Sequence, residues 1–344
     1  MKHHKFAAFL AAAALLTALT SCAAEPAPQT ASERDVFAMD TFMTMKAYGD
    51  GADKALEAAE TRIFELESEL SVTEADSDIS RINSAKGAAV EVSPDTALLV
   101  GAGAQYWQDT AGALDISVYP VLREWGFTTG EYKVPDSSTI AKLLKNVCGG
   151  EISVSGSTVQ IPADSEIDLG ALAKGYTGDE IMAIFRENGV SSGLVSLGGN
   201  VQALGSKPDG SDWRVGIKDP FSPDDNMCVV SIADKAVVTS GNYERCFEAD
   251  DGKVYWHIID PADGCPADNG LVSVTIIGSK GLQCDALSTA LFVMGTDKAQ
   301  TYLADHTDVE AVLVTDDGRL LYTDGLREKL DITGDMPSEV IARD

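Results

Sequence analysis

The chain has 344 residues, with 26 basic and 54 acidic side chains and a formal net charge of −28. A surface this acidic repels nucleic acid and anionic lipid headgroups, so we expect no nucleic-acid partner. A negatively charged substrate would need a local positive charge in order to bind. The length is sufficient for a sizeable core in one large domain or in two lobes.

The first 21 residues have the features of a secretory signal peptide. Basic residues precede the apolar run FAAFLAAAALLTAL, which is too short to span a bilayer comfortably. The run ends in LTSC, which resembles the lipobox of bacterial lipoproteins and indicates lipid modification of Cys22. An ordinary signal peptide followed by a chance cysteine is the alternative. Residues 22–35 are small, polar and Pro-containing, so we expect a tether there and the folded domain at 36–344.

Three helices are predicted from apolar spacing and from residues typical of helix ends. Apolar side chains in residues 53–70 recur every three or four positions, as on an amphipathic helix. A Ser-Pro pair begins the second predicted helix, residues 93–109, because Ser caps helix starts and Pro suits the first turn. The stretch IDLGALAKGYTGDEI begins at residue 167 and is expected to start a third helix, which ends at Gly189.

Strands dominate the second half of the chain. Single strands are predicted at GLVSL, DWRVGI, CVVSIA, AVVTS and LVSVTII. YERCFE and KVYWHII flank ADDG, and VEAVLVT and RLLYT flank DDG, so each pair is predicted to form a hairpin. DALSTALFVMG, between the two hairpins, is predicted to be a helix. Helices followed by mainly antiparallel strands favour an α+β fold.

Several common kinds of site are not indicated. The five cysteines after Cys22 are an odd number without zinc-like spacing, so they predict no disulfide framework. Residues 189–193, GVSSG, match G-x-S-x-G, but they lie between a helix and a strand, the reverse of the order in a serine hydrolase. Walker, G-x-G-x-x-G and H-E-x-x-H patterns are absent from the sequence.

Two segments carry polar side chains suited to chemistry. His257 comes late in a predicted strand, and two interpretations remain open, a hydrogen-bonded residue at a sheet edge or a member of a site. Asp285 and Thr289 are four residues apart and therefore share one face of a helix, where a carboxylate and a hydroxyl could hold a hard cation such as Mg²⁺. The alternative for Asp285 is a cap at the start of that helix.

Eight segments, taken in order from Met39 to Gly295, resemble the ApbE family of flavin transferases. They are MDTFMTM, LSVTEADSDISRIN, GALDISVYP, IDLGALAKGYTGDEI, SLGGN, VTSGNYERCFE, HIIDPADG and CDALSTALFVMG. Members of this family are extracytoplasmic lipoproteins that use Mg²⁺ and FAD to attach FMN to a Thr or Ser hydroxyl of a partner protein, with release of AMP.

The resemblance has consequences for fold, partners and location. It implies an α+β fold with FAD in a cleft, an acceptor flavoprotein subunit that carries the target Thr or Ser, and attachment to the bacterial inner membrane through lipid on Cys22. Some members are FAD pyrophosphatases, in which water replaces the hydroxyl, and this activity is one alternative. A flavin-binding lipoprotein without catalysis is the other.

The resemblance also implies roles for particular residues. It implies FAD contacts from Met39, Ala113, Leu114, Asp115, Asp168, Lys174 and Ile259. It implies metal ligation by the main-chain carbonyl of Ala171 and by the side chains of Asp285 and Thr289. His257 matches a histidine that assists proton transfer, so it is expected to be catalytic together with Asp285. Lys174 would then provide the cation that a diphosphate needs.

Two departures from the family pattern qualify these roles. The segment Ser71-Val72-Thr73 lacks the aromatic residue that many members have there, so one expected ring contact is missing from it. Ser288 stands where some members have a second acid, which favours one metal ion over two.

Overall fold

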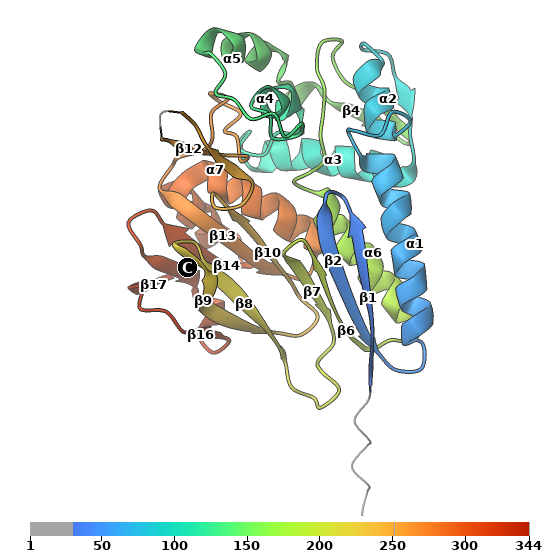
Figure 1. The fold of residues 1–344 in the computed structure, drawn as a ribbon, viewed down its shortest axis with the longest axis vertical. Helices are drawn as coiled ribbons and strands as arrows, with labels where there is room; N and C mark the ends of the chain where they lie inside the picture. Colours follow the sequence, from blue (N-terminus) through green and yellow to red (C-terminus); the bar gives the residue numbers. More distant parts are fainter. Residues whose placement is uncertain (1–29, 251, 344) are drawn as a thin grey trace, which may run out of the picture.

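A sheet of nine strands runs through the centre of the computed structural model, which describes residues 30–250 and 252–343 (Figure 1). The strand order is β1-β2-β6-β7-β10-β13-β14-β15-β17, and neighbours are antiparallel except for the parallel pair β15 and β17. The strands are β1 (Ala31–Ala38), β2 (Thr41–Tyr48), β6 (Ser192–Leu197), β7 (Asn200–Leu204), β10 (Ala236–Gly241), β13 (Leu271–Gly278), β14 (Glu310–Thr315), β15 (Leu320–Thr323) and β17 (Ser338–Ile341).

Both faces of the sheet are covered. Three long helices pack on one face: α1 (Ala52–Leu70), α6 (Ala173–Glu187) and α7 (Gly281–Asp305). A three-stranded sheet packs on the other: β8 (Trp213–Asp219), β9 (Ser222–Ile232) and β16 (Leu330–Ile332). Along β14, Ala311 and Leu313 pack in the cluster that contains α7, while Val312 and Val314 pack with β8 and β9. Side chains of a strand alternate between faces, so the four central residues of this strand are all apolar.

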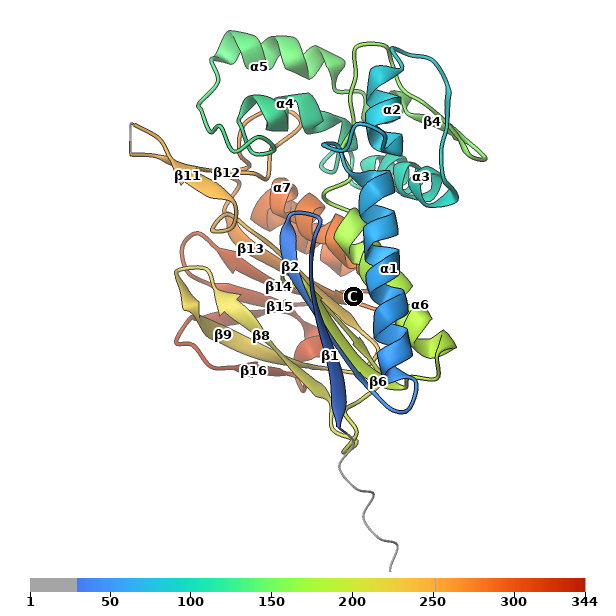
Figure 2. The same ribbon diagram turned by 45° about the vertical axis from the view of Figure 1, so that its right-hand side comes forward.

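Residues 78–160 form a cap at one end of the molecule (Figures 1 and 2). The cap contains α2 (Asp78–Ser84), α3 (Pro94–Asp109), α4 (Tyr119–Glu124), α5 (Ser137–Leu143) and the small strands β3 (Val90–Glu91), β4 (Ser153–Ser155) and β5 (Thr158–Gln160). Leu99 of α3 packs in one cluster with Leu172, just before α6, and Ala286 of α7. The cap therefore rests on the beginnings of these two helices. The hairpin β11 (Cys246–Glu248) and β12 (Val254–Trp256) lies beside it (Figure 2).

Most elements predicted from the sequence are confirmed, including the α+β class. α1 and α3 match the predicted helices closely, and the Ser93 hydroxyl accepts a hydrogen bond from the Thr96 N–H. The predicted strands correspond to β6, β8, β9, β10 and β13, and both predicted hairpins form. The start of the third helix is wrong, because α6 begins at Ala173 and Asp168 precedes it. His257 comes one residue after the end of β12.

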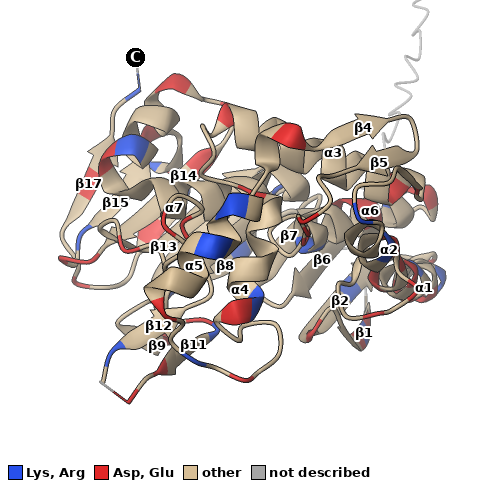
Figure 3. Cartoon of the chain, turned by 90° about the horizontal axis from the view of Figure 1, so that it is seen from above, with Lys and Arg blue, Asp and Glu red and all other residues tan. Residues whose placement is uncertain are grey.

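The N-terminal boundary differs from the prediction. Strand β1 begins at Ala31, so residues 31–35 of the predicted tether belong to the central sheet. The predicted signal peptide and Cys22 lie outside the described residues. No helix within residues 30–250 and 252–343 has the length and apolar character needed to cross a membrane. Acidic side chains are spread over many elements (Figure 3), in line with the composition.

Gly175 of α6 and Gly281 of α7 bring these two helices into backbone contact. A Cβ on Gly175 would lie 2.2 Å from the Gly281 carbonyl oxygen, and a Cβ on Gly281 would lie 2.3 Å from the Gly175 carbonyl oxygen. The Gly175 N–H donates to Asp285 Oδ2 at 2.8 Å. In return, the N–H groups of Gly281 and Leu282 donate to the two carboxylate oxygens of Asp179, at 2.7 and 3.0 Å. Each helix start is thus capped by an acid from the other helix.

Replacing Gly175 with Ala should destabilise the protein, because the added methyl has no room against the Gly281 carbonyl. We expect a loss of about 1–3 kcal/mol in the free energy of unfolding, measured by urea denaturation. Gly101→Ala is the matched control, since Gly101 lies within α3 and a Cβ there meets nothing within 4 Å. That control should gain about 0.5–1 kcal/mol. Equal stability of the two variants would contradict the close helix contact.

Candidate functional site

A cavity of about 580 Å³ lies between the cap, the tip of the β1–β2 hairpin and the beginnings of α6 and α7. Its volume is in the range typical of small-molecule sites. Every site residue predicted in the folded domain lines it, with the exception of Met39. These residues are Ala113, Leu114, Asp115, Asp168, Ala171, Lys174, His257, Ile259, Asp285 and Thr289.

Met39 lies at the hairpin tip, but the structure does not bring it into the lining. Its backbone has a left-handed φ of 50°, and its N–H donates to the Glu67 carboxylate at 2.6 Å. Its sulfur accepts a hydrogen bond from the Thr177 hydroxyl at 3.7 Å, so the side chain packs against α6. The next three residues, Asp40, Thr41 and Phe42, line the cavity instead.

The segment before α6 supplies a carboxylate, a carbonyl and an ammonium group. Asp168 Oδ1 accepts from the Gly170 N–H at 2.8 Å, and Lys174 Nζ donates to the Gly170 carbonyl at 3.2 Å. The Gly175 N–H would bond to the Ala171 carbonyl in a regular helical turn, but it donates to Asp285 instead. This diversion leaves the Ala171 carbonyl without its helical partner, beside the cavity.

Asp285 and Thr289 lie one turn apart on α7 and both line the cavity. Asp285 is 4% exposed. The alternative that it caps its own helix is wrong, because α7 begins at Gly281 and Asp285 lies within it. The Thr289 hydroxyl is 3.3 Å from the Ser240 hydroxyl. Ser288 is fully buried and does not line the cavity. Its hydroxyl is hydrogen-bonded to the Ser240 hydroxyl.

Asp115 lies on the opposite wall, in the turn after α3. Its Oδ1 accepts from the Ser117 N–H and hydroxyl at 2.8 and 2.5 Å, and its Oδ2 accepts from the Gly149 N–H at 3.2 Å. Burial raises the pKa of Asp115, and these hydrogen bonds partly oppose that effect. Burial also raises the pKa of Asp168, opposed by the Gly170 N–H and by the charges of Lys174 and Arg245.

His257 faces the cavity as a neutral imidazole. Burial, together with the positive charges of Arg245 and Lys174, lowers the pKa of His257 to about 4. Its ring meets Phe127 edge-on, with centroids 6.4 Å apart. Within the described part of the chain, its buried Nδ1 has no hydrogen-bond partner. The side chain itself lines the cavity.

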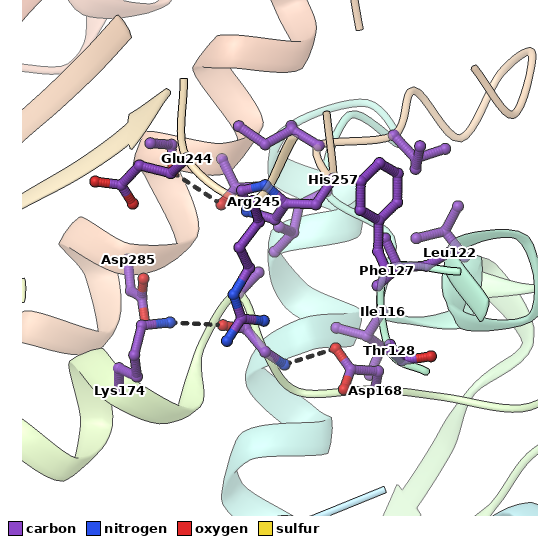
Figure 4. Close-up of a pocket in the computed structure, with 18 of the residues that line it drawn as sticks. Ile116, Leu122, Phe127, Thr128, Asp168, Lys174, Glu244, Arg245, His257 and Asp285 are labelled. Atoms are coloured by element: carbon purple, nitrogen blue, oxygen red, sulfur yellow. Dashed lines mark hydrogen bonds between the residues drawn. The ribbon is translucent and has the colours of Figure 1, made fainter. Parts of the chain in front are cut away.

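Sequence reasoning did not single out two charged lining residues, Glu244 and Arg245. Both follow β10, and Figure 4 shows them close to His257, with the Arg245 side chain extending toward Lys174 and Asp168. Burial raises the pKa of Glu244, against the charges of Lys218, Lys174 and Arg245. The segment VTSGNYERCFE belongs to the family resemblance, and this was the available signal.

The polar groups on α7 and before α6 fit a hard metal ion better than a zinc-type ion. In residues 30–250 and 252–343, no three His, Cys, Asp or Glu side chains gather in a way that could hold a metal. A carboxylate, a hydroxyl and a carbonyl freed from its helix are all oxygen donors, which Mg²⁺ prefers. The set leaves coordination positions for water or for substrate oxygens.

Comparison with known proteins identifies the family. The profile described as the ApbE family matches residues 39–313. This chain belongs to the ApbE family. A protein of Klebsiella pneumoniae named FAD:protein FMN transferase is 34% identical over 268 residues, which are 75% of this chain and 83% of that protein. A protein of the same name from Treponema pallidum is 32% identical over 294 residues, 80% of this chain and 81% of that protein.

Solved ApbE structures have the same fold. The Thermotoga maritima ApbE protein superposes with a TM-score of 0.82 at 31% identity, covering 87% of this chain and 99% of that one. The Pseudomonas stutzeri flavinyl transferase ApbE, in its apo form, gives a TM-score of 0.79 at 29% identity, with coverage of 89% and 98%. These similarities confirm the α+β fold and the ApbE resemblance predicted from the sequence.

We expect His257 to stay neutral until the pH falls to about 4, and NMR of labelled imidazoles can follow its titration. Replacing Arg245 with Gln should move that titration toward the ordinary histidine pKa of about 6.5, because a nearby positive charge is lost. His306 is the internal reference, since it is exposed and stacked on Tyr302, away from the cavity. A midpoint near that of a free histidine in the unmodified protein would contradict the described burial.

Proposed function

We propose that this ApbE family member transfers FMN from FAD to a Thr or Ser hydroxyl of a target protein and releases AMP. The observation that carries the proposal is the meeting of Asp285, Thr289, the Ala171 carbonyl and Lys174 in one cavity with an apolar wall. The names of the relatives support the reaction class, because those proteins are called FAD:protein FMN transferases.

The two kinds of wall suit the two parts of FAD. Leu122, Phe127 and Ile259 form an apolar wall that suits a flat aromatic ring system. Lys174 and the oxygen donors on α7 form a polar wall that suits a diphosphate. A diphosphate would otherwise be repelled, because the chain carries a net charge of −28.

We propose that Mg²⁺ is held by Asp285, Thr289 and the Ala171 carbonyl. Their support is chemical, since all three are oxygen donors and two of them come from consecutive turns of one helix. When bound, the ion would neutralise charge on the diphosphate, which is the main requirement of phosphoryl transfer besides positioning. The Asp285 Oδ2 also accepts a hydrogen bond from the Gly175 N–H.

In the proposed reaction one phosphorus–oxygen bond forms and one breaks. The acceptor hydroxyl oxygen forms a bond to the phosphorus on the riboflavin side, the bond between that phosphorus and the bridging oxygen breaks, and AMP leaves with that oxygen. Neutral His257, which lines the cavity, accepts the hydroxyl proton. General-base assistance of this kind contributes about 10²- to 10⁴-fold. Lys174 offsets the charge of the departing phosphate.

We also propose that the domain is lipid-anchored through Cys22 on the outer side of the bacterial inner membrane. The apolar run and LTSC support this location. The acceptor would then be a flavoprotein subunit that displays its Thr or Ser at the same surface.

One assay separates this activity from its alternatives. Protein, FAD and Mg²⁺ are incubated with and without an acceptor peptide that bears a target Thr, and AMP and FMN are quantified. A transferase produces AMP only with acceptor and leaves FMN bound to the peptide. A pyrophosphatase produces AMP and free FMN without acceptor, and a flavin-binding protein produces neither. Either of the last two results would overturn the proposed transfer.

The proposed metal ligands can be tested on one helix. Asp285→Asn and Thr289→Val should each weaken Mg²⁺ binding measured by calorimetry and lower Mg²⁺-dependent AMP release, because each removes an oxygen donor or its charge. Asp297→Asn and Thr301→Val are the matched controls, since both residues are exposed on the later turns of α7. If the first pair binds Mg²⁺ as tightly as the controls do, the ligand assignment fails.

A further inference from the structure

An ion pair joins two sides of the cavity mouth. Arg245, from the loop after β10, donates from Nη2 to Asp40 Oδ2 at 3.1 Å, and Asp40 belongs to the tip of the β1–β2 hairpin. The two residues are 205 positions apart in the chain. Both line the cavity, and neither is assigned a role by the reaction described above. The pair is therefore within reach of a ligand in the cavity.

The backbone of Arg245 is in an unusual conformation. Its φ of 40° lies in the left-handed region that residues other than glycine seldom adopt. Such conformations persist where the surrounding structure imposes them, and they cluster at ligand-binding positions. The φ of 57° at Asp40 has a local cause, because Met39 and Asp40 form the two-residue turn of the β1–β2 hairpin.

Arg245 and Lys174 act on the same three groups. The positive charges of both lower the pKa of His257, and both oppose the burial that raises the pKa of Asp168 and of Glu244. Lys174 comes from α6 and Arg245 from the loop between β10 and β11, yet their charges reach one space. Figure 4 shows the Arg245 side chain directed from the Glu244 side of the cavity toward Lys174.

The Asp40 carboxylate is a weak partner for Arg245. Its side chain is 85% exposed and that of Arg245 is 50% exposed, and ion pairs between exposed side chains contribute little to stability. A phosphate group is a stronger partner, because the planar guanidinium donates two parallel hydrogen bonds to it. An incoming phosphate can therefore displace Asp40 at small cost.

We propose that Arg245 determines specificity for the diphosphate of FAD, by exchanging Asp40 for a phosphate oxygen opposite Lys174 when the dinucleotide binds. The proposal rests on the proposed function, because it takes FAD as the ligand. It adds a second cation to the polar wall, supplied by a different element from Lys174. Asp40 holds the guanidinium at the cavity wall and releases it to the ligand.

The experiment compares FAD with riboflavin, which has the same ring system but no phosphate. Each ligand is titrated into the full protein without acceptor, and flavin fluorescence reports the dissociation constant. Arg245→Gln should weaken FAD binding roughly 10- to 100-fold, the effect of losing one charge-assisted hydrogen bond, and leave riboflavin binding unchanged. Lys174→Ala should behave in the same way. Asp40→Asn should bind FAD at least as tightly as the unmodified protein, because it removes the competing carboxylate.

Arg214→Gln is the matched control, since Arg214 forms a comparable exposed pair with Asp331 at 2.9 Å, in the three-stranded sheet away from the cavity. The inference is overturned if Arg245→Gln binds FAD like this control, or loses FAD and riboflavin equally. It is also overturned if Asp40→Asn weakens FAD binding as much as Arg245→Gln, because the ion pair would then only stabilise the structure.

If Arg245→Gln raises only the KM for the acceptor in the AMP-release assay, the inference is overturned and Arg245 is assigned to the acceptor instead. Failure of the unmodified protein to bind FAD would count against the proposed function itself.

Discussion

The contact between α6 and α7 at Gly175 and Gly281 is the constraint on which the candidate site depends. Two helix starts with no side chains between them can approach until their backbones touch, and the exchanged caps from Asp179 and Asp285 then hold them in register. Because the Gly175 N–H is taken by Asp285, the carbonyl of Ala171, a residue that lines the cavity, loses its helical partner. The same packing that joins the helices thus places three oxygen donors together.

Two cations lie among the acidic side chains that line the cavity. The protein has 54 acidic and 26 basic side chains, yet two cations, Lys174 and Arg245, act on the groups around this space. Burial, together with these two charges, lowers the pKa of His257, and the same charges oppose the burial that raises the pKa of Glu244. An anionic ligand therefore meets two cations within a lining that is otherwise acidic, and the imidazole beside them is unprotonated at neutral pH.

The sequence predicted the ends of those helices whose capping residues are neighbours in the chain. It did not predict the start of a helix that is capped by a distant residue. Ser93 and Pro94 mark the start of α3 without help from the rest of the chain. The start of α6 was misplaced because its capping acid, Asp285, is 110 positions away. The β1–β2 turn carries Met39 and Asp40 instead of glycine, so it gave no turn signal, although the buried alternation of Met43, Met45 and Ala47 marks β2. The family resemblance located most of the cavity, but it assigned no role to Arg245.

The double use of Asp285 links the fold to the proposed chemistry. Its Oδ2 caps α6, and among residues 30–250 and 252–343 no hydrogen bond to its Oδ1 is found, so that oxygen is available at the cavity. The Asp285 carboxylate is held by a backbone N–H of α6. Its orientation therefore does not depend on a second, flexible side chain. A cation bound there would interact with both helix starts at once, and any ligand that binds only the folded state stabilises it. The helix contact and the binding of a metal ion would then reinforce each other, because both need the same carboxylate in the same place.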